Sequence, residues 1–133
     1  MYIAVDDTDS IRGNCTTFLA TEIIRELSSD FDLIGNPRLV RLNPAVPWKT
    51  RGNGSLILRF GKGAGERHLI GKIDGKDLYC YEESVDVPYE RQAILERIIQ
   101  LSIGKNNVEK FKKEDPTFAY LEGYTPAIQT RII

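Results

Sequence analysis

Three aspartates stand within four positions near the start of the chain, and this spacing suits a metal ion. Asp6, Asp7 and Asp9 follow the apolar run at 2–5, which predicts a buried strand that ends in a polar loop. Carboxylate oxygens are the ligands that Mg²⁺ prefers, with waters completing its octahedron. An ion held in this way could bridge the phosphates of a nucleotide. Because Asp, Ser and Thr are also common in ordinary loops, a purely structural loop remains an alternative.

A helix is expected directly after this loop. Thr16 and Thr17 are candidate N-caps, and apolar residues recur at helical spacing from there until Ser28. The amides and the positive dipole end of a helix N-terminus favour a nearby phosphate group. A metal held by carboxylates beside such a terminus suits phosphoryl transfer, which needs mainly positioning and charge neutralisation. Cys15, which precedes the threonines, is interpreted as a small buried residue rather than a nucleophile.

A second segment, 44–54, combines a stacking ring, two cations and glycines. Trp48 could stack on a base, while Lys49 and Arg51 could contact phosphate. The glycines allow a ligand to approach the backbone closely. The segment is too long for a simple turn, which favours a functional loop. The alternative is a structural tryptophan that packs the loop onto the core while the charges stay in solvent.

The composition indicates a soluble globular protein. The chain has 133 residues, 41% of them hydrophobic and 28% charged, which suits one domain, alone or with a small companion. No apolar run approaches the roughly 18–20 residues that a membrane span needs, so we expect a cytoplasmic protein without a membrane partner. Cys15 and Cys80 lack metal-type spacing and are expected to be free thiols.

The net charge of −1 conceals an uneven distribution of charge. Basic residues predominate from 36 to 72, and acidic residues predominate from 74 to 96. The basic stretch could attract a polyanion such as nucleic acid. Solvated faces of charged side chains explain the same pattern without any ligand.

The pattern beyond the first helix predicts several strands and one more helix. Asp74 and Gly75 mark a hairpin, since glycine tolerates the positive φ that such turns require. A second helix is expected with Pro88 in its first turn and its end near Gly104. The order of elements indicates an α+β fold, or an α/β sandwich, with a mainly antiparallel sheet and two main helices. The strands after the first helix are expected over 31–34, 39–42, 55–60, 69–73 and 77–81.

Two motifs, occurring in order, resemble the opening of the archaeal tRNA(Ile) 2-agmatinylcytidine synthetase family. The resemblance covers about the first 60 residues, and Tyr124-Thr125-Pro126 is a further trace of it. Asn14 departs from the methionine that the family usually has there, and the neighbouring Asp and Thr residues are intact. The matching residues are Asp6-Asp7-Thr8-Asp9-Ser10, Gly13, Cys15-Thr16-Thr17, Arg41-Leu42-Asn43-Pro44 and Pro47-Trp48-Lys49-Thr50-Arg51-Gly52-Asn53-Gly54.

The resemblance implies a ligase that uses ATP and agmatine to replace the C2 oxygen of the wobble cytidine in tRNA(Ile). Asp6, Asp7 and Asp9 would hold Mg²⁺ and the triphosphate, and Thr16 would be the threonine that becomes phosphorylated. The anticodon loop suits this chemistry because its unpaired bases can be splayed into a pocket. The residues implied to bind ATP, phosphate or the base are Thr8, Ser10, Thr17, Trp48, Lys49, Thr50, Arg51, Gly52 and Asn53.

The resemblance also bears on domain organisation. Residues 1–133 are expected to form an N-terminal kinase-like catalytic region, with a small α+β subdomain in about 62–115. The oligonucleotide-binding fold and the zinc ribbon that the family carries are not found in this sequence. The sequence is therefore consistent with a fragment, with a split subunit whose missing domains a partner chain supplies, or with a degenerate paralogue. Two other functions remain open. One is a non-catalytic RNA-binding or assembly subunit, and the other is a phosphotransferase acting on a small molecule.

Overall fold

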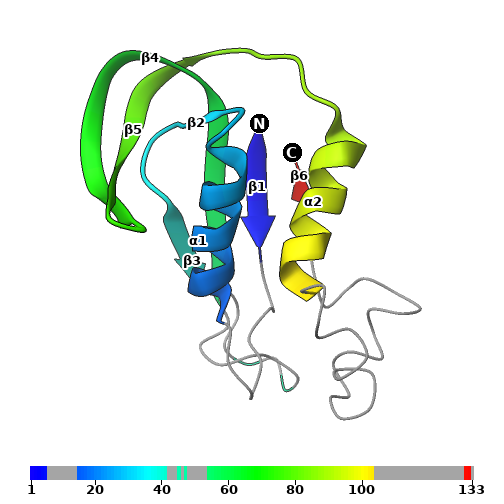
Figure 1. The fold of residues 1–133 in the computed structure, drawn as a ribbon. Helices are drawn as coiled ribbons and strands as arrows, with labels where there is room; N and C mark the ends of the chain where they lie inside the picture. The colour runs from blue at the N-terminus through cyan, green and yellow to red at the C-terminus, as the bar shows by residue number, and fades with distance from the viewer. Residues whose placement is uncertain (6–14, 42–44, 46, 48–53, 104–130, 133) are drawn as a thin grey trace.

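One long strand organises the sheet. The computed structural model describes residues 1–5, 15–41, 45, 47, 54–103 and 131–132 (Figure 1). Within them, β4 (Gly54–Ile73) pairs antiparallel with every other strand except β6. Its first part runs between β1 (Tyr2–Val5) on one side and β2 (Asp32–Leu33) and β3 (Arg38–Arg41) on the other. The short β6 (Arg131–Ile132) pairs with the free side of β1.

The second part of β4 forms a hairpin that leaves the plane of the sheet. It pairs with β5 (Lys76–Val85) through a turn at Asp74 and Gly75, both of which have positive φ. The hairpin arches over, and its tip lies beside the first helix (Figure 1). There the Nε of Arg25 donates to an Asp74 carboxylate oxygen at 2.7 Å. The predicted hairpin and its turn are therefore confirmed.

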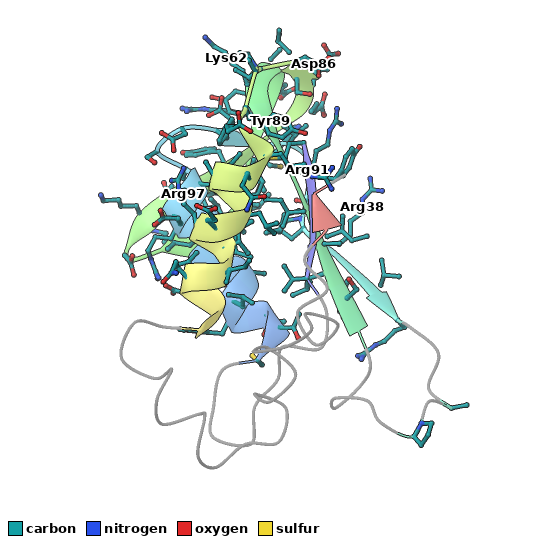
Figure 2. The ribbon with its side chains drawn as sticks, turned by 90° about the vertical axis from the view of Figure 1, so that its right-hand side faces the viewer. Arg38, Lys62, Asp86, Tyr89, Arg91 and Arg97 are labelled. Atoms are coloured by element: carbon teal, nitrogen blue, oxygen red, sulfur yellow. The ribbon has the colours of Figure 1, made fainter. Side chains whose placement is uncertain are left out.

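Both helices pack on the same face of the sheet (Figure 2). These are α1 (Thr16–Leu27) and α2 (Arg91–Ile103). The apolar stripe of α1 turns toward the strands because its buried residues recur every three or four positions. The core between the layers is formed by Ile3, Val5, Leu19, Ala20, Ile23, Ile24, Leu27, Leu33, Leu56, Leu58, Phe60, Cys80, Ile94 and Ile98.

The predicted α+β class with a mainly antiparallel sheet and two helices is confirmed. One prediction was wrong, because the strands expected at 55–60 and 69–73 are parts of one continuous strand. The second helix begins at Arg91 and not at Pro88. No helix of the described part is long and apolar enough to cross a membrane. The subdomain predicted in about 62–115 stays a prediction, and residues 104–115 lie outside the described residues.

Candidate functional site

The described ends of both predicted motifs lie at one edge of the sheet. Val5, the residue before the aspartate motif, pairs with Leu56 of β4. On the opposite side of β4, Leu56 pairs with Leu39 of β3. Two positions further along, Arg41 pairs with Gly54, and these two residues flank the second motif. The sheet register therefore brings the two motif-bearing segments to adjacent strand ends, although they are far apart in sequence.

A buried hydroxyl fixes this edge. Ser55 is only 8% exposed, and its Oγ donates to the carbonyl oxygen of Val5 at 3.2 Å. At Gly54, an added Cβ would lie 3.0 Å from Cδ1 of Leu39, so a side chain there would force Leu39 to move. The sequence predicted Ser55 only as the start of a strand. Its positioning role was missed because the signal is a single polar residue that the register places against β1.

The N-terminus of α1 lies at the same end of the molecule, where β1 also ends (Figure 1). Cys15 is its N-cap, with φ −109° and ψ 166°, and the carbonyl of Cys15 accepts a hydrogen bond from the Leu19 amide at 3.0 Å. The prediction that Thr16 or Thr17 caps the helix was wrong, because helical geometry already begins at Thr16. The side chain of Cys15 does not cap the helix, and the first turn of α1 holds no acidic residue. The positive dipole end is thus not neutralised by its own first turn, which favours an anion there.

The two threonines differ in exposure. Thr16 is 8% exposed, whereas Thr17 is exposed and its Oγ1 lies 2.8 Å from the Cys15 Sγ. Cys15 is itself exposed, so its interpretation as a buried residue was wrong, whereas Cys80 is buried in the core. Both are free thiols, as predicted.

The other predicted site residues lie outside the described residues, and their roles stay predictions. This holds for the three aspartates that would carry Mg²⁺ and for the tryptophan with its neighbouring cations. The residues concerned are Asp6, Asp7, Thr8, Asp9, Ser10, Trp48, Lys49, Thr50, Arg51, Gly52 and Asn53.

The uneven charge along the sequence corresponds in part to pairing between β4 and β5. The guanidinium of Arg59 lies 5.4 Å from the Tyr2 ring centroid and donates to Ser84 Oγ at 3.0 Å. Lys72 forms an ion pair with Asp77 at 3.4 Å. Several basic residues of 36–72 therefore contact partners within the fold, and this lowers the share of the stretch that can attract a polyanion. Arg38 and Arg41 of β3 are exposed near the motif edge.

Comparison with known proteins finds a matching family model and similar proteins. The model of the TiaS TCKD domain family matches residues 2–120. A 2-agmatinylcytidine synthetase TiaS of Thermoplasma volcanium, which acts on an isoleucine tRNA, is 45% identical over 115 residues, which are 86% of this chain and 24% of that protein. The protein of the same name from Pyrococcus horikoshii is 50% identical over 60 residues, covering 45% of this chain and 14% of its own length.

The similar solved structures also include TiaS. The crystal structure of a complex of TiaS with its isoleucine tRNA and ATP is 28% identical with a TM-score of 0.50, covering 77% of this chain and 19% of that one. A tRNA fluorescent labelling enzyme is 29% identical with a TM-score of 0.50, covering 77% of this chain and 18% of its own. The chain thus spans about a quarter, or less, of the length of these relatives. Nevertheless, the family model covers most of the chain, and the chain therefore belongs to the TiaS family, to whose TCKD domain it corresponds.

Proposed function

We propose that this chain supplies the ATP-using, cytidine-activating part of a tRNA(Ile) 2-agmatinylcytidine synthetase. The observation that carries the proposal is the sheet register, which anchors the aspartate motif and the tryptophan motif at adjacent strand ends, Val5 and Gly54. The start of α1 lies at the same end of the molecule. Segments that carry acidic and cationic residues, anchored at the end of the molecule where a helix begins, suit the binding of a nucleoside triphosphate.

The chemistry explains why ATP is needed. The C2 carbonyl of cytosine is a poor electrophile, because the ring nitrogens donate electrons into it. Transfer of a phosphoryl group to the C2 oxygen creates a good leaving group. The agmatine amine then attacks C2, the C2–O bond breaks, and phosphate leaves with the oxygen. Asp6, Asp7 and Asp9 are proposed to hold Mg²⁺, which when bound would neutralise charge on the triphosphate.

Thr16 is proposed as the residue that becomes phosphorylated, with Thr17 beside it in the first turn of α1. The dipole end of the helix favours the charge that such a step places there. Lys49, Arg51 and Asn53 are proposed to contact phosphate or the flipped base. Because Thr16 is largely shielded and Thr17 is exposed, the two hydroxyls can be distinguished experimentally.

The whole reaction is proposed to need more than this chain. The relatives are about four times longer, or more, and a structure of TiaS with tRNA and ATP is among the similar ones. We propose that residues 1–133 act as the kinase-like region and receive the anticodon loop of tRNA(Ile) in the cytoplasm. The remaining domains of the family, in the same polypeptide or in a partner chain, would grip the rest of the tRNA, and agmatine would enter as the second substrate.

The test is ATP-dependent phosphorylation by the full chain with Mg²⁺, with and without tRNA(Ile) transcript and agmatine. We expect radiolabel from the γ-phosphate of ATP on the wild-type protein, and its loss in Asp7→Ala and in Thr16→Ala. Thr16→Ser should retain label because it keeps a hydroxyl at the same position. Thr21→Ala is the matched control, since Thr21 lies on the same helix and donates its Oγ1 hydrogen bond to the Thr17 carbonyl at 3.1 Å.

Three results would contradict the proposal. Absence of nucleotide binding and of label in the folded wild type, checked by circular dichroism, would leave a binding or assembly subunit as the better explanation. Label that survives in Thr16→Ala and disappears in Thr17→Ala would move the acceptor to the exposed threonine. Turnover on a small molecule that tRNA neither changes nor requires would indicate the phosphotransferase alternative.

A further inference from the structure

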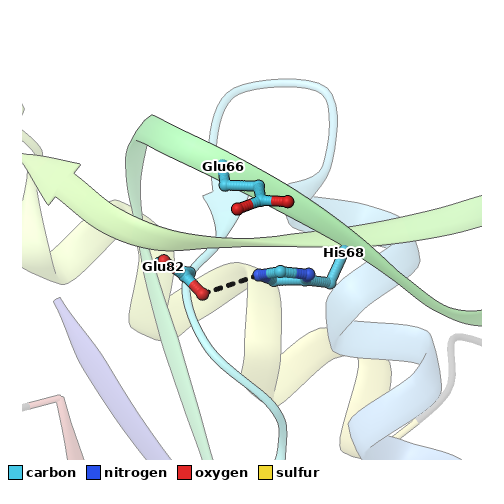
Figure 3. Close-up of side chains that lie close together, drawn as sticks. All are labelled: Glu66, His68 and Glu82. Atoms are coloured by element: carbon cyan, nitrogen blue, oxygen red, sulfur yellow. Dashed lines mark hydrogen bonds and ion pairs between the residues drawn. The ribbon is translucent and has the colours of Figure 1, made fainter.

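Three side chains with metal-binding donor atoms converge on the β4–β5 hairpin, away from the motif edge. Glu66 and His68 come from β4, and Glu82 comes from β5 (Figure 3). One donor atom from each residue lies within 4.8 Å of the other two. The closest pair is His68 Nε2 and Glu82 Oε1, at 2.8 Å.

The pairing of the two strands places the three side chains on one face of the hairpin, next to a β-bulge. Ala64 pairs with Glu83, and the next pair is Arg67 with Tyr81, so Gly65 and Glu66 together oppose Glu82. Gly65 has φ 75°, the left-handed conformation that glycine adopts easily at the first position of such a bulge. Followed back from the Arg67–Tyr81 pair, the ladder places Glu66 beside Glu82, and Glu66 shares one face of β4 with His68, two positions away (Figure 3). The convergence is therefore set by the backbone, not by chance rotamers alone.

The cluster has an imbalance of charge. Like charges that face each other on neighbouring strands are destabilising. Within the described part of the chain, His68 contacts the Glu82 carboxylate, and no hydrogen bond or ion pair engages Glu66. The guanidinium of Arg67, the nearest cation in sequence, lies over the Tyr79 ring at 4.3 Å. A bound cation at this point would relieve the repulsion and use all three donors.

We propose that Glu66, His68 and Glu82 bind a divalent transition-metal ion, with Zn²⁺ as its representative. An imidazole nitrogen favours such ions over Mg²⁺ and Ca²⁺, which prefer oxygen ligands alone. With Zn–N and Zn–O bonds of about 2.0–2.2 Å, tetrahedral ligands lie about 3.3–3.6 Å apart. The side chains of His68 and Glu82 are 45% and 59% exposed, so small rotations suffice to reach that spacing. Water completes the coordination.

The bound ion would cross-link the two strands of the hairpin. Its ligands come from both strands and flank the bulge, where the ladder of backbone pairs is interrupted. Because the three donors meet only in the folded hairpin, ion binding stabilises the folded state. This cross-link would stabilise the bend that places the hairpin tip beside α1.

The sequence contains a single histidine, and this makes the test specific. We would titrate the full chain, labelled with ¹⁵N at histidine, with ZnCl₂ and follow the His68 ring nitrogens by NMR. Zn²⁺ bound to the aspartate motif or to the exposed Cys15 does not ligate an imidazole and leaves this signal unchanged. We expect saturation at one equivalent for the imidazole signal, no response to MgCl₂, and a higher Tm with Zn²⁺.

Removal of a single carboxylate distinguishes a site from an isolated exposed histidine. Glu66→Gln and Glu82→Gln should each weaken the NMR-detected affinity by about tenfold or more, since even outer-sphere partners of a metal site contribute roughly 10–100-fold. Glu83→Gln is the matched control, because it removes the same charge from the same strand outside the cluster. The proposal would be overturned if the His68 ring signals did not change with excess Zn²⁺. Equal affinities of the three folded variants for Zn²⁺ would overturn it as well.

Discussion

Gly63 illustrates how one residue limits the shape of the hairpin. A Cβ at this position would lie 2.3 Å from Cγ and Cδ2 of the Tyr81 ring, far inside van der Waals contact. Gly71, later in the same strand, has nothing within 4 Å of an added Cβ. The ring of Tyr81 can therefore lie over the β4 backbone only where that backbone has no side chain.

We expect Gly63→Ala to lower the free energy of unfolding by about 1–3 kcal/mol, the usual range for a methyl group forced into an occupied space. Gly71→Ala, the matched control, should be neutral or stabilise by up to about 1 kcal/mol, because it reduces the freedom of the unfolded chain. Urea denaturation of both variants measures the difference. Equal midpoints would mean that the Tyr81 ring moves aside without cost.

Some residue-level features could be predicted from sequence, and others could not. The turn at Asp74 and Gly75 was predictable because few residues accept positive φ, and both do so here. The cluster around His68 was not predictable, since the sequence does not reveal which residue of the partner strand lies beside Glu66 and His68. The exposure of Cys15 was missed for a related reason, because it depends on where helical geometry begins.

At the scale of elements, Arg97 joins the two helices. Its guanidinium donates to the carboxylates of Glu26 and Asp30 at 3.0 and 2.7 Å, and to the backbone carbonyl of Glu26 at 3.0 Å. The hydrogen bond with Asp30, and to a smaller extent the one with Glu26, raises the pKa of Arg97. Both hydrogen bonds therefore favour the charged form of the guanidinium.

Arg97→Ala should lower the free energy of unfolding by about 1–2 kcal/mol, since partly exposed ion pairs contribute up to about 1 kcal/mol and the backbone contact adds to this. Arg91→Ala, at the exposed start of the same helix, should change stability by less than about 0.5 kcal/mol. Thermal melts at low and high salt separate the two. A melting point for Arg97→Ala equal to that of Arg91→Ala would show that helix packing rests on apolar contacts alone.

The length of β4 was the main element that sequence reasoning missed. Gly61, Gly63 and Gly65 interrupt the apolar pattern and predict a break between two strands. In the structure the strand continues through these glycines, where Gly63 lies against the Tyr81 ring and Gly65 is part of the bulge. A glycine in the sequence indicates either a turn or a position where another group approaches the backbone closely. The sequence alone does not distinguish the two, because the answer depends on the partner strand.

At the scale of the whole molecule, one core holds the two layers together. Ile23 of α1 is fully buried, and the core around it includes Phe60 from the sheet and Ile98 from α2. The helical and strand periodicities predicted these layers correctly. They could not predict which strand lies in the middle, because strand order depends on contacts between segments distant in sequence.

We expect Ile23→Ala to lower the free energy of unfolding by about 2–5 kcal/mol, because it leaves a cavity where three elements meet. Phe18→Ala on the same helix is the control, since Phe18 is 49% exposed and its truncation should cost far less. Chemical denaturation monitored by circular dichroism gives both values. A small effect at Ile23 would mean that the layers close around the missing side chain.

The position of β1 has a consequence for how the protein is made. This strand is synthesised before its partner strands, yet it lies between β4 and β6, and the hydrogen bond between Met1 and Phe60 joins residues 59 apart in sequence. At roughly 5–20 residues per second, β1 waits about 3–12 s for its first partner strand. During that interval the apolar segment before the aspartates has no native partner strand, so a chaperone that holds nascent apolar segments would bind it before the sheet forms.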